Sequence, residues 1–147
     1  MTLQNLLKIG QLDKHETNAE QVRRMLDSAE RSITDARQET ISWETRLDAA
    51  YRSITQCCMV ALWANGCRPA KSKPGHHQTM IQSLVHSIGF DREQMLLLNT
   101  FRVKRNAIDY TGDEVDAASL EECIAAADDL LRNVTQWIAD SKPNLAL

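Results

Sequence analysis

Turn-forming residues are scarce in this sequence, which holds only 5 glycines and 3 prolines among 147 residues. Folds built from many short strands need frequent tight turns, and glycine and proline supply most of them. The scarcity therefore favours a few long helices. No apolar run approaches the roughly 18 residues that a membrane-spanning helix requires. We accordingly expect a soluble protein with no membrane partner.

Common metal and enzyme motifs are also missing. The four cysteines show neither the CxxC nor the Cys/His spacing of a metal site. The sequence contains no Gly-rich phosphate loop, no GxSxG and no HExxH. Its start lacks the charged and apolar regions of a secretory signal peptide. These absences predict a cytoplasmic protein with buried thiols, no metal and no cofactor.

The charge balance limits the kind of nucleic-acid contact that is possible. A formal net charge of -3 and an isoelectric point near 5.8 argue against a protein that coats duplex DNA through its overall charge. Any nucleic-acid site would have to be a local patch of basic residues.

Apolar residues recur at helical spacing along most of the chain. Side chains at Ser42 and Asp91 are suited to cap helices, and Gly66 and Gly112 stand where helices would end. The expected helices span 18–36, 42–65, 80–88, 91–111 and 116–140. Residues 1–15 form a short helix or arm, 68–75 an exposed loop and 141–147 a tail. The sequence thus predicts one all-α domain over residues 1–147, an up-and-down antiparallel bundle of about five main helices.

Polar groups concentrate near the end of the helix expected over 91–111. Arg102, Asn106 and either Asp109 or Tyr110 share a face at i, i+4 and i+7 or i+8, while Arg105 and Asp109 form a second i, i+4 pair. Guanidinium, amide, carboxylate and phenol groups at this density are typical of a binding site. The alternative is a solvated, salt-bridged helix end whose basic residues face the negative end of the helix dipole.

Two adjacent histidines are the other candidates for chemistry. His76 and His77 are expected in a loop with Arg68, Lys71 and Lys73, where they could supply an acid or a base, or could simply belong to a basic loop. The tryptophans Trp43, Trp63 and Trp137 sit on or near apolar stripes. We therefore expect them to pack in the core or at a dimer interface, and not to stack on nucleic-acid bases. Tyr51 is expected in the core.

Several segments, in order, resemble proteins of the HEPN family (higher eukaryotes and prokaryotes nucleotide-binding). They are AER at 29–31, RLDAAYRSI at 46–54, GCRP at 66–69, GHH at 75–77 and residues 102–112. The resemblance covers roughly 18–140 and is most specific around Tyr51 and in the Arg-Asn-x-x-Asp-Tyr pattern from Arg105 to Tyr110. It implies a helical bundle that forms a homodimer, with the motif helices of two protomers lining a polar cleft. It also implies a possible nucleotidyltransferase partner, in a toxin–antitoxin or defence setting.

Ribonuclease members of that family carry an arginine, usually a polar residue after it, and then a histidine that is separated from the arginine by four to six residues. Arg105 and Asn106 match the first half, but Tyr110, Thr111 and Gly112 stand where the histidine would be. Metal-independent RNA cleavage needs a base with a pKa near neutrality. A tyrosine, with an ordinary pKa of about 10, is a poor base at neutral pH.

The sequence therefore favours binding over catalysis. We expect Arg102 and Arg105 to contact phosphate, Asn106 to position the ligand and Asp109 to orient Arg105, in a homodimer that binds a nucleotide, RNA or a nucleotidyltransferase. One alternative is a ribonuclease toxin in which His76, His77 or Tyr110 replaces the missing histidine. Another is a structural adaptor that only dimerises. The expected ligand-binding residues are Arg102, Arg105, Asn106, Asp109, Tyr110, His76 and His77.

Overall fold

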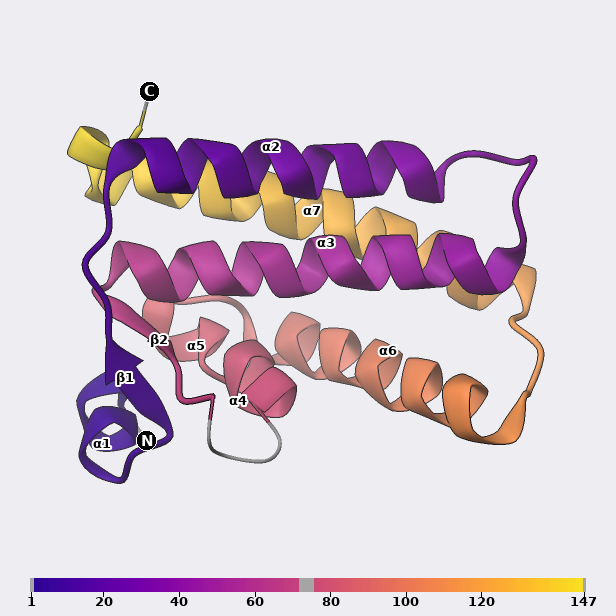
Figure 1. Ribbon diagram of the computed structural model, residues 1–147, viewed down its shortest axis with the longest axis horizontal. Helices are drawn as coiled ribbons and strands as arrows, with labels where there is room; N and C mark the ends of the chain where they lie inside the picture. The colour runs from indigo at the N-terminus through magenta and orange to yellow at the C-terminus, as the bar shows by residue number, and fades with distance from the viewer. Residues whose placement is uncertain (1, 72–75, 147) are drawn as a thin grey trace.

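A computed structural model describes residues 2–71 and 76–146. Among these residues, four long helices form an up-and-down bundle in which each helix runs antiparallel to the previous one (Figure 1). They are α2 (Ala19–Ala36), α3 (Trp43–Ala64), α6 (Arg92–Thr111) and α7 (Ala117–Ser141). This confirms the all-α bundle that the apolar stripes predicted.

The ends of the long helices are set by the residues that the sequence identified. Ser42 Oγ accepts a hydrogen bond of 3.2 Å from the Thr45 amide, and Asp91 Oδ2 accepts one of 3.1 Å from the Gln94 amide. Such caps satisfy amides that have no partner within the helix. Gly112 ends α6 with a left-handed φ of 71°, a conformation that costs glycine little.

Helix α3 lies at the centre of the bundle and packs against α2, α7 and α6. Its buried residues include Leu47, Ile54 and Leu62, each no more than 2% exposed. Phe101 brings α6 into the same core. All four cysteines are buried and free, as expected, and burial raises the pKa of Cys123 to about 12. A thiol in such surroundings stays protonated and unreactive.

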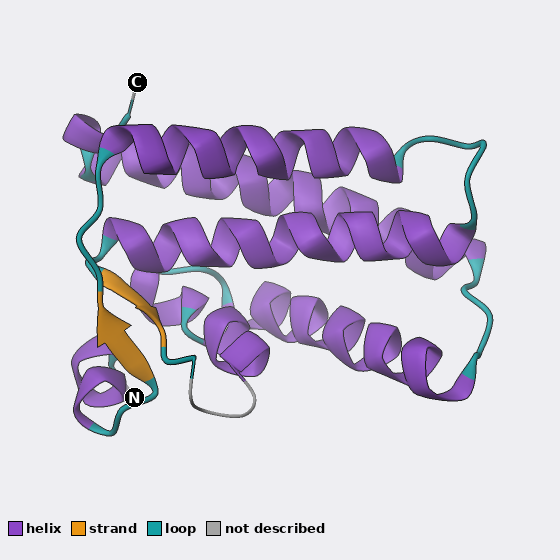
Figure 2. Cartoon of the chain, in the orientation of Figure 1, coloured by secondary structure: helices purple, strands orange, loops and turns teal. Residues whose placement is uncertain are grey.

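A small antiparallel sheet is the main feature that the sequence did not predict (Figure 2). After the short helix α1 (Leu3–Lys8), strand β1 (Leu12–Lys14) pairs with strand β2 (Cys67–Pro69), with Leu12 opposite Pro69. The expectation of a loop beginning at Arg68 is therefore wrong for the first residues of that segment. Strands of three residues are too short to show the alternation by which strands are recognised.

The helix expected over 80–88 is divided into α4 (His76–Gln82) and α5 (Leu84–Ser87). Between them, the Ser83 hydroxyl donates a hydrogen bond of 2.7 Å to the Met80 carbonyl. His76 and His77 consequently lie in the first turn of α4, and their assignment to a loop is wrong. The rest of that expected loop, at 72–75, lies outside the described residues.

Two side chains with apolar spacing lie at the surface. Leu97 of α6 is 41% exposed, and Trp43 is 45% exposed, so of the two expected places for Trp43, the core and a dimer interface, the core of the protomer is ruled out. The expected tail contains a 3₁₀ turn, η1 (Pro143–Leu145), whose Leu145 is buried against the bundle. No helix within the described ranges is both long and apolar enough to cross a membrane.

Candidate functional site

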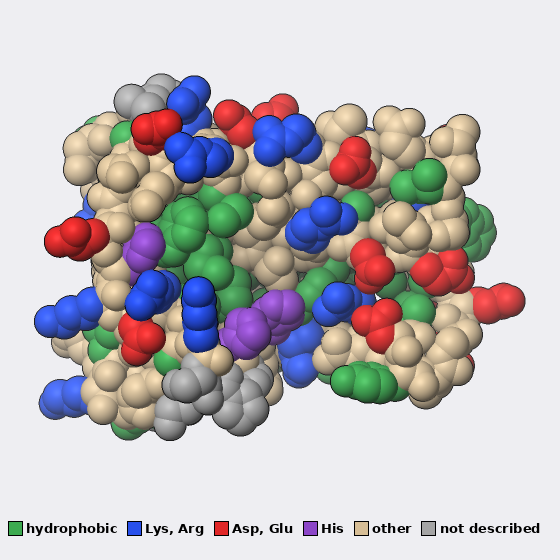
Figure 3. Space-filling model, in the orientation of Figure 1, with side chains coloured by type: hydrophobic (Ala, Val, Ile, Leu, Met, Phe, Trp, Pro, Cys, Tyr) green, Lys and Arg blue, Asp and Glu red, His purple; other side chains and the backbone are tan. Residues whose placement is uncertain are grey.

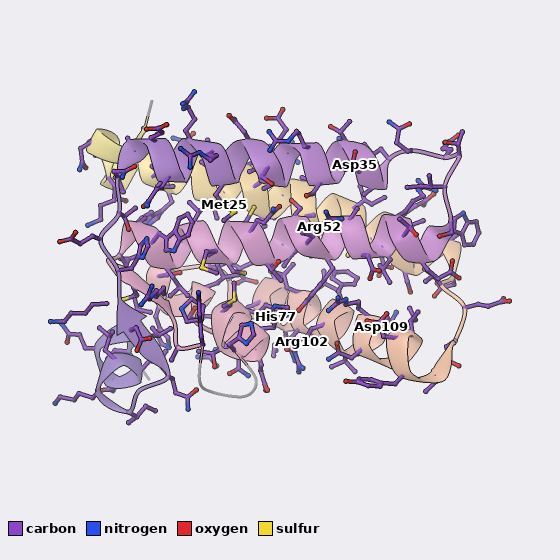
Figure 4. The ribbon with its side chains drawn as sticks, in the orientation of Figure 1. Met25, Asp35, Arg52, His77, Arg102 and Asp109 are labelled. Carbon is purple, nitrogen blue, oxygen red and sulfur yellow. The ribbon has the colours of Figure 1, made fainter. Side chains whose placement is uncertain are left out.

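Side chains from three helices meet on one face of the molecule. Figure 3 shows histidine, lysine and arginine side chains gathered on this face beside an apolar patch. Figure 4 shows His77 of α4 next to Arg102 of α6. The contacts described below join His77, and Arg105 of α6, to α3. We call this group the α3–α4–α6 cluster, and it consists of Asp48, Tyr51, His77, Arg102, Arg105 and Asp109.

Arg105 is held by two carboxylates and an aromatic ring. Its Nε lies 3.4 Å from Asp48 Oδ1 and 3.6 Å from Asp109 Oδ2, and its Cζ lies 5.3 Å from the centre of the Tyr51 ring. The pair with Asp109 is the one that the i, i+4 spacing predicted. A guanidinium above an aromatic ring also gains a cation–π attraction. The charge of Arg105 is therefore already compensated within the protomer.

Arg102 is in a different electrostatic position. Its Nε donates a hydrogen bond of 2.9 Å to Asn99 Oδ1, which is neutral. In the part of the chain that the structure describes, Arg102 pairs with no carboxylate. It is half-buried, so water screens its charge less than that of a fully exposed side chain. Arg102 is therefore the cationic group of the cluster that is best placed to attract an anion.

A histidine and a buried tyrosine connect α4 to α3. Tyr51 is 2% exposed, and its hydroxyl lies 3.4 Å from His77 Nδ1. Burial raises the pKa of Tyr51 to about 12, so the phenol keeps its proton. Burial also lowers the pKa of His77, and the neighbouring His76, Arg105 and Arg102 lower it further. His77 is accordingly neutral at pH 7 and offers one donor and one acceptor nitrogen.

His76 extends this group towards the surface. Its exposed imidazole meets the His77 ring edge to face, with 4.6 Å between ring centres and 76° between planes. The two histidines that the sequence singled out are thus in contact with each other. Only His77 reaches the hydroxyl of Tyr51.

Comparison of the chain with protein-family models, with curated proteins and with solved structures finds no match. The resemblance to HEPN proteins therefore stays a prediction that depends on the quoted motifs. No group of three or more His, Cys, Asp or Glu residues among the described positions is arranged to hold a metal ion.

The structure does not bring every expected site residue together. Tyr110 is 88% exposed and lies on an outward stripe of α6 that also carries Leu96 and Val103. These three residues are spaced at i, i+7 and i+14, so they lie along one side of the helix. Asn106 is half-buried, and it follows Arg102 by four residues and Val103 by three. It therefore lies between the cluster and the outward stripe.

Two members of the cluster were missed from the sequence. Tyr51 was expected only as a core residue, and Asp48 was not singled out. The charged Asp48 interrupts the otherwise apolar sequence from Leu47 to Tyr51, which is a weak signal. A carboxylate three residues before a tyrosine shares a helix face with it, but the spacing does not reveal that Arg105 lies opposite.

Proposed function

We propose that the α3–α4–α6 cluster binds the phosphate of a nucleotide or of RNA, in a HEPN-like protein that works as a homodimer without efficient catalysis of its own. The observation that carries the proposal is the placement of Arg102, which has no carboxylate partner in the described structure, beside the neutral imidazole of His77. A guanidinium binds phosphate through two parallel hydrogen bonds, and an imidazole N–H adds a third donor.

The other groups of the cluster have supporting roles in this proposal. Asp48 and Asp109 hold Arg105 against the Tyr51 ring. The Tyr51 hydroxyl in turn contacts His77 Nδ1, which fixes the orientation of the imidazole. Arg105 therefore positions the site, and Arg102 is the principal phosphate ligand. The motif quoted from the sequence begins at Arg105, whereas this proposal makes Arg102 the residue that contacts phosphate most directly.

The outward stripe supports the homodimer. Leu96, Val103 and Tyr110 are 53%, 52% and 88% exposed, which is unusual for three large side chains aligned on one helix. An exposed apolar stripe of this kind marks a contact surface. If α6 pairs with its copy in a second protomer, Asn106 lies at the edge of the contact and two clusters face a shared cleft.

Binding of nucleic acid tests the proposal directly. We would measure the affinity of the wild-type protein for a labelled short single-stranded RNA and for AMP, and compare it with that of Arg102→Gln. Loss of hydrogen bonds to a charged group weakens binding by at least about 10-fold. The matched control is Arg132→Gln, which removes an exposed arginine of α7 that pairs with Asp128. Absence of binding by the wild-type protein would overturn the proposal.

Ribonuclease activity is a second candidate, and the placement of His77 favours it. A neutral imidazole beside Arg102 can take the proton of a 2′-hydroxyl as the 2′ oxygen attacks phosphorus and the bond to the 5′ oxygen breaks. The leaving 5′ oxygen would then take a proton from water or from His76. For Nε2 to act as the base, Nδ1 must carry the proton and donate it to the Tyr51 oxygen.

Cleavage in the presence of a chelator distinguishes the two candidates. A ribonuclease that uses His77 degrades single-stranded RNA under these conditions, and His77→Asn abolishes cleavage while leaving RNA binding largely in place. If the wild-type protein binds RNA and leaves it intact, the ribonuclease candidate fails and the binding function stands.

A further inference from the structure

A pocket lies beside the α3–α4–α6 cluster, on the side of His76. Its apolar lining comes from Met59 and Trp63 of α3 and Pro69 of β2, and its polar lining from His15, Arg68, Lys71 and His76. We call it the Trp63 pocket. Its volume is about 370 Å³, which falls within the range of small-molecule sites of about 300–1,000 Å³. The sequence assigned Trp63 to the core or an interface, but the structure places it in the wall of this pocket.

The pocket and the cluster are continuous through the two histidines. His76 lines the pocket and touches His77, and the His77 ring centre lies 5.9 Å from that of Tyr51. The rings of His76, His77 and Tyr51 thus follow one another, and Arg105 lies above the ring of Tyr51. In Figure 3 the histidines of this region lie between an apolar patch and further basic side chains. One elongated ligand can therefore contact both places at once.

The lining of the pocket suits a flat, unsaturated group attached to an anion. One face of the Trp63 indole stacks on the imidazole of His15, with 5.1 Å between ring centres and 16° between planes. The indole also lines the pocket, where a flat ring can pack against the part that His15 leaves uncovered. Arg68 and Lys71 are exposed at the rim and attract negative charge. Inorganic phosphate would leave the apolar wall unused, and a neutral hydrocarbon would leave the cations unused. A nucleotide uses both.

We propose that the Trp63 pocket is a base-binding subsite, which holds the base of a nucleotide unit whose phosphate is bound by Arg102 and His77. This inference rests on the proposed function, since it assumes that the cluster binds phosphate. Stacking on aromatic side chains contributes affinity with little dependence on base identity, because every base has a flat face. The subsite therefore accepts either a free mononucleotide or one unit of a single-stranded RNA.

The decisive measurement compares ligands with and without a base. We expect the wild-type protein to bind AMP about 5- to 150-fold more tightly than ribose phosphate, the range that stacking of one base provides. Trp63→Leu should remove this preference and leave the affinity for ribose phosphate unchanged. Trp43→Leu is the matched control, because Trp43 is exposed at the start of α3 and does not line the pocket. It should keep the preference.

A second measurement does not require the Trp63 variant to fold. With Trp43 and Trp137 both replaced by Phe, the remaining tryptophan fluorescence reports Trp63 alone, and AMP should quench it where ribose phosphate does not. An RNA with one abasic position tests the polymer in the same way. The subsite is refuted if the abasic RNA binds as tightly as intact RNA and AMP binds no more tightly than ribose phosphate. Binding of all these ligands without discrimination would leave the phosphate site standing, whereas binding of none would refute the proposed function itself.

Discussion

The sharpest test of the electrostatic argument is to compare two neutralised versions of the cluster. The first is Arg102→Gln, which removes the guanidinium that has no carboxylate partner among the described residues. The second is the triple variant Asp48→Asn, Arg105→Gln, Asp109→Asn, which replaces the whole charged triad by neutral amides. We expect Arg102→Gln to weaken RNA binding strongly and the triple variant to weaken it much less, because the triad only positions the site.

The expected magnitudes follow from the contacts. Hydrogen bonds to a charged group contribute about 1.5–3 kcal/mol, so loss of Arg102 weakens binding by about 10- to 150-fold. The triad carries one positive and two negative charges, and its replacement removes a net negative charge from the neighbourhood of the phosphate. The side chains of Arg105, Asp48 and Asp109 are 32%, 47% and 49% exposed. Solvent-exposed ion pairs contribute only up to about 1 kcal/mol each to the free energy of unfolding, so the triple variant should still fold.

The assay is an RNA titration repeated over a range of salt concentrations. Each phosphate contact on a single strand contributes about 0.7 to the slope of log affinity against log salt. Arg102→Gln should reduce that slope by about this amount, and the triple variant should not reduce it. If the triple variant loses as much affinity as Arg102→Gln, or if only the triple variant changes the slope, then Arg105 is the phosphate ligand and our reasoning is wrong.

Three further outcomes are expected. Because the folded state lowers the pKa of His77 below its ordinary value of about 6.5, the unfolded chain binds more protons in acid, and stability falls as pH drops below about 7. His77→Asn should make the melting temperature fall less over this range, as measured by circular dichroism. Phe101 is 1% exposed, so Phe101→Ala leaves a cavity in the core and should lower the free energy of unfolding by about 3–5 kcal/mol, as measured by urea titration. Val103→Glu places a charge in the outward stripe of α6 and should convert the proposed dimer to a monomer in sedimentation experiments. A wild-type protein that sediments as a monomer would contradict this last prediction.

The long helices could be predicted because each depends on information that is local in the sequence. Ser42 and Asp91 cap the amides that follow them directly, and Gly112 supplies the left-handed residue at the end of α6. The small sheet could not be predicted in this way. Leu12 pairs with Pro69, so the partner that makes each three-residue strand lies far along the chain. Local propensity has little weight for such segments, because the pairing itself stabilises them.

The same distinction explains what could be predicted of the candidate site. The contact between Arg105 and Asp109 follows from the geometry of one helix, and the structure contains it. Asp48 reaches Arg105 across 57 positions of sequence, and this contact adds a second carboxylate to the one that Asp109 supplies. The spacing within α6 already suggests that Arg105 is partly compensated and that Arg102 is not, because the residue four positions after Arg102 is the neutral Asn106. The full difference between the two arginines depends on the packing of α3 against α6, which no spacing within α6 contains.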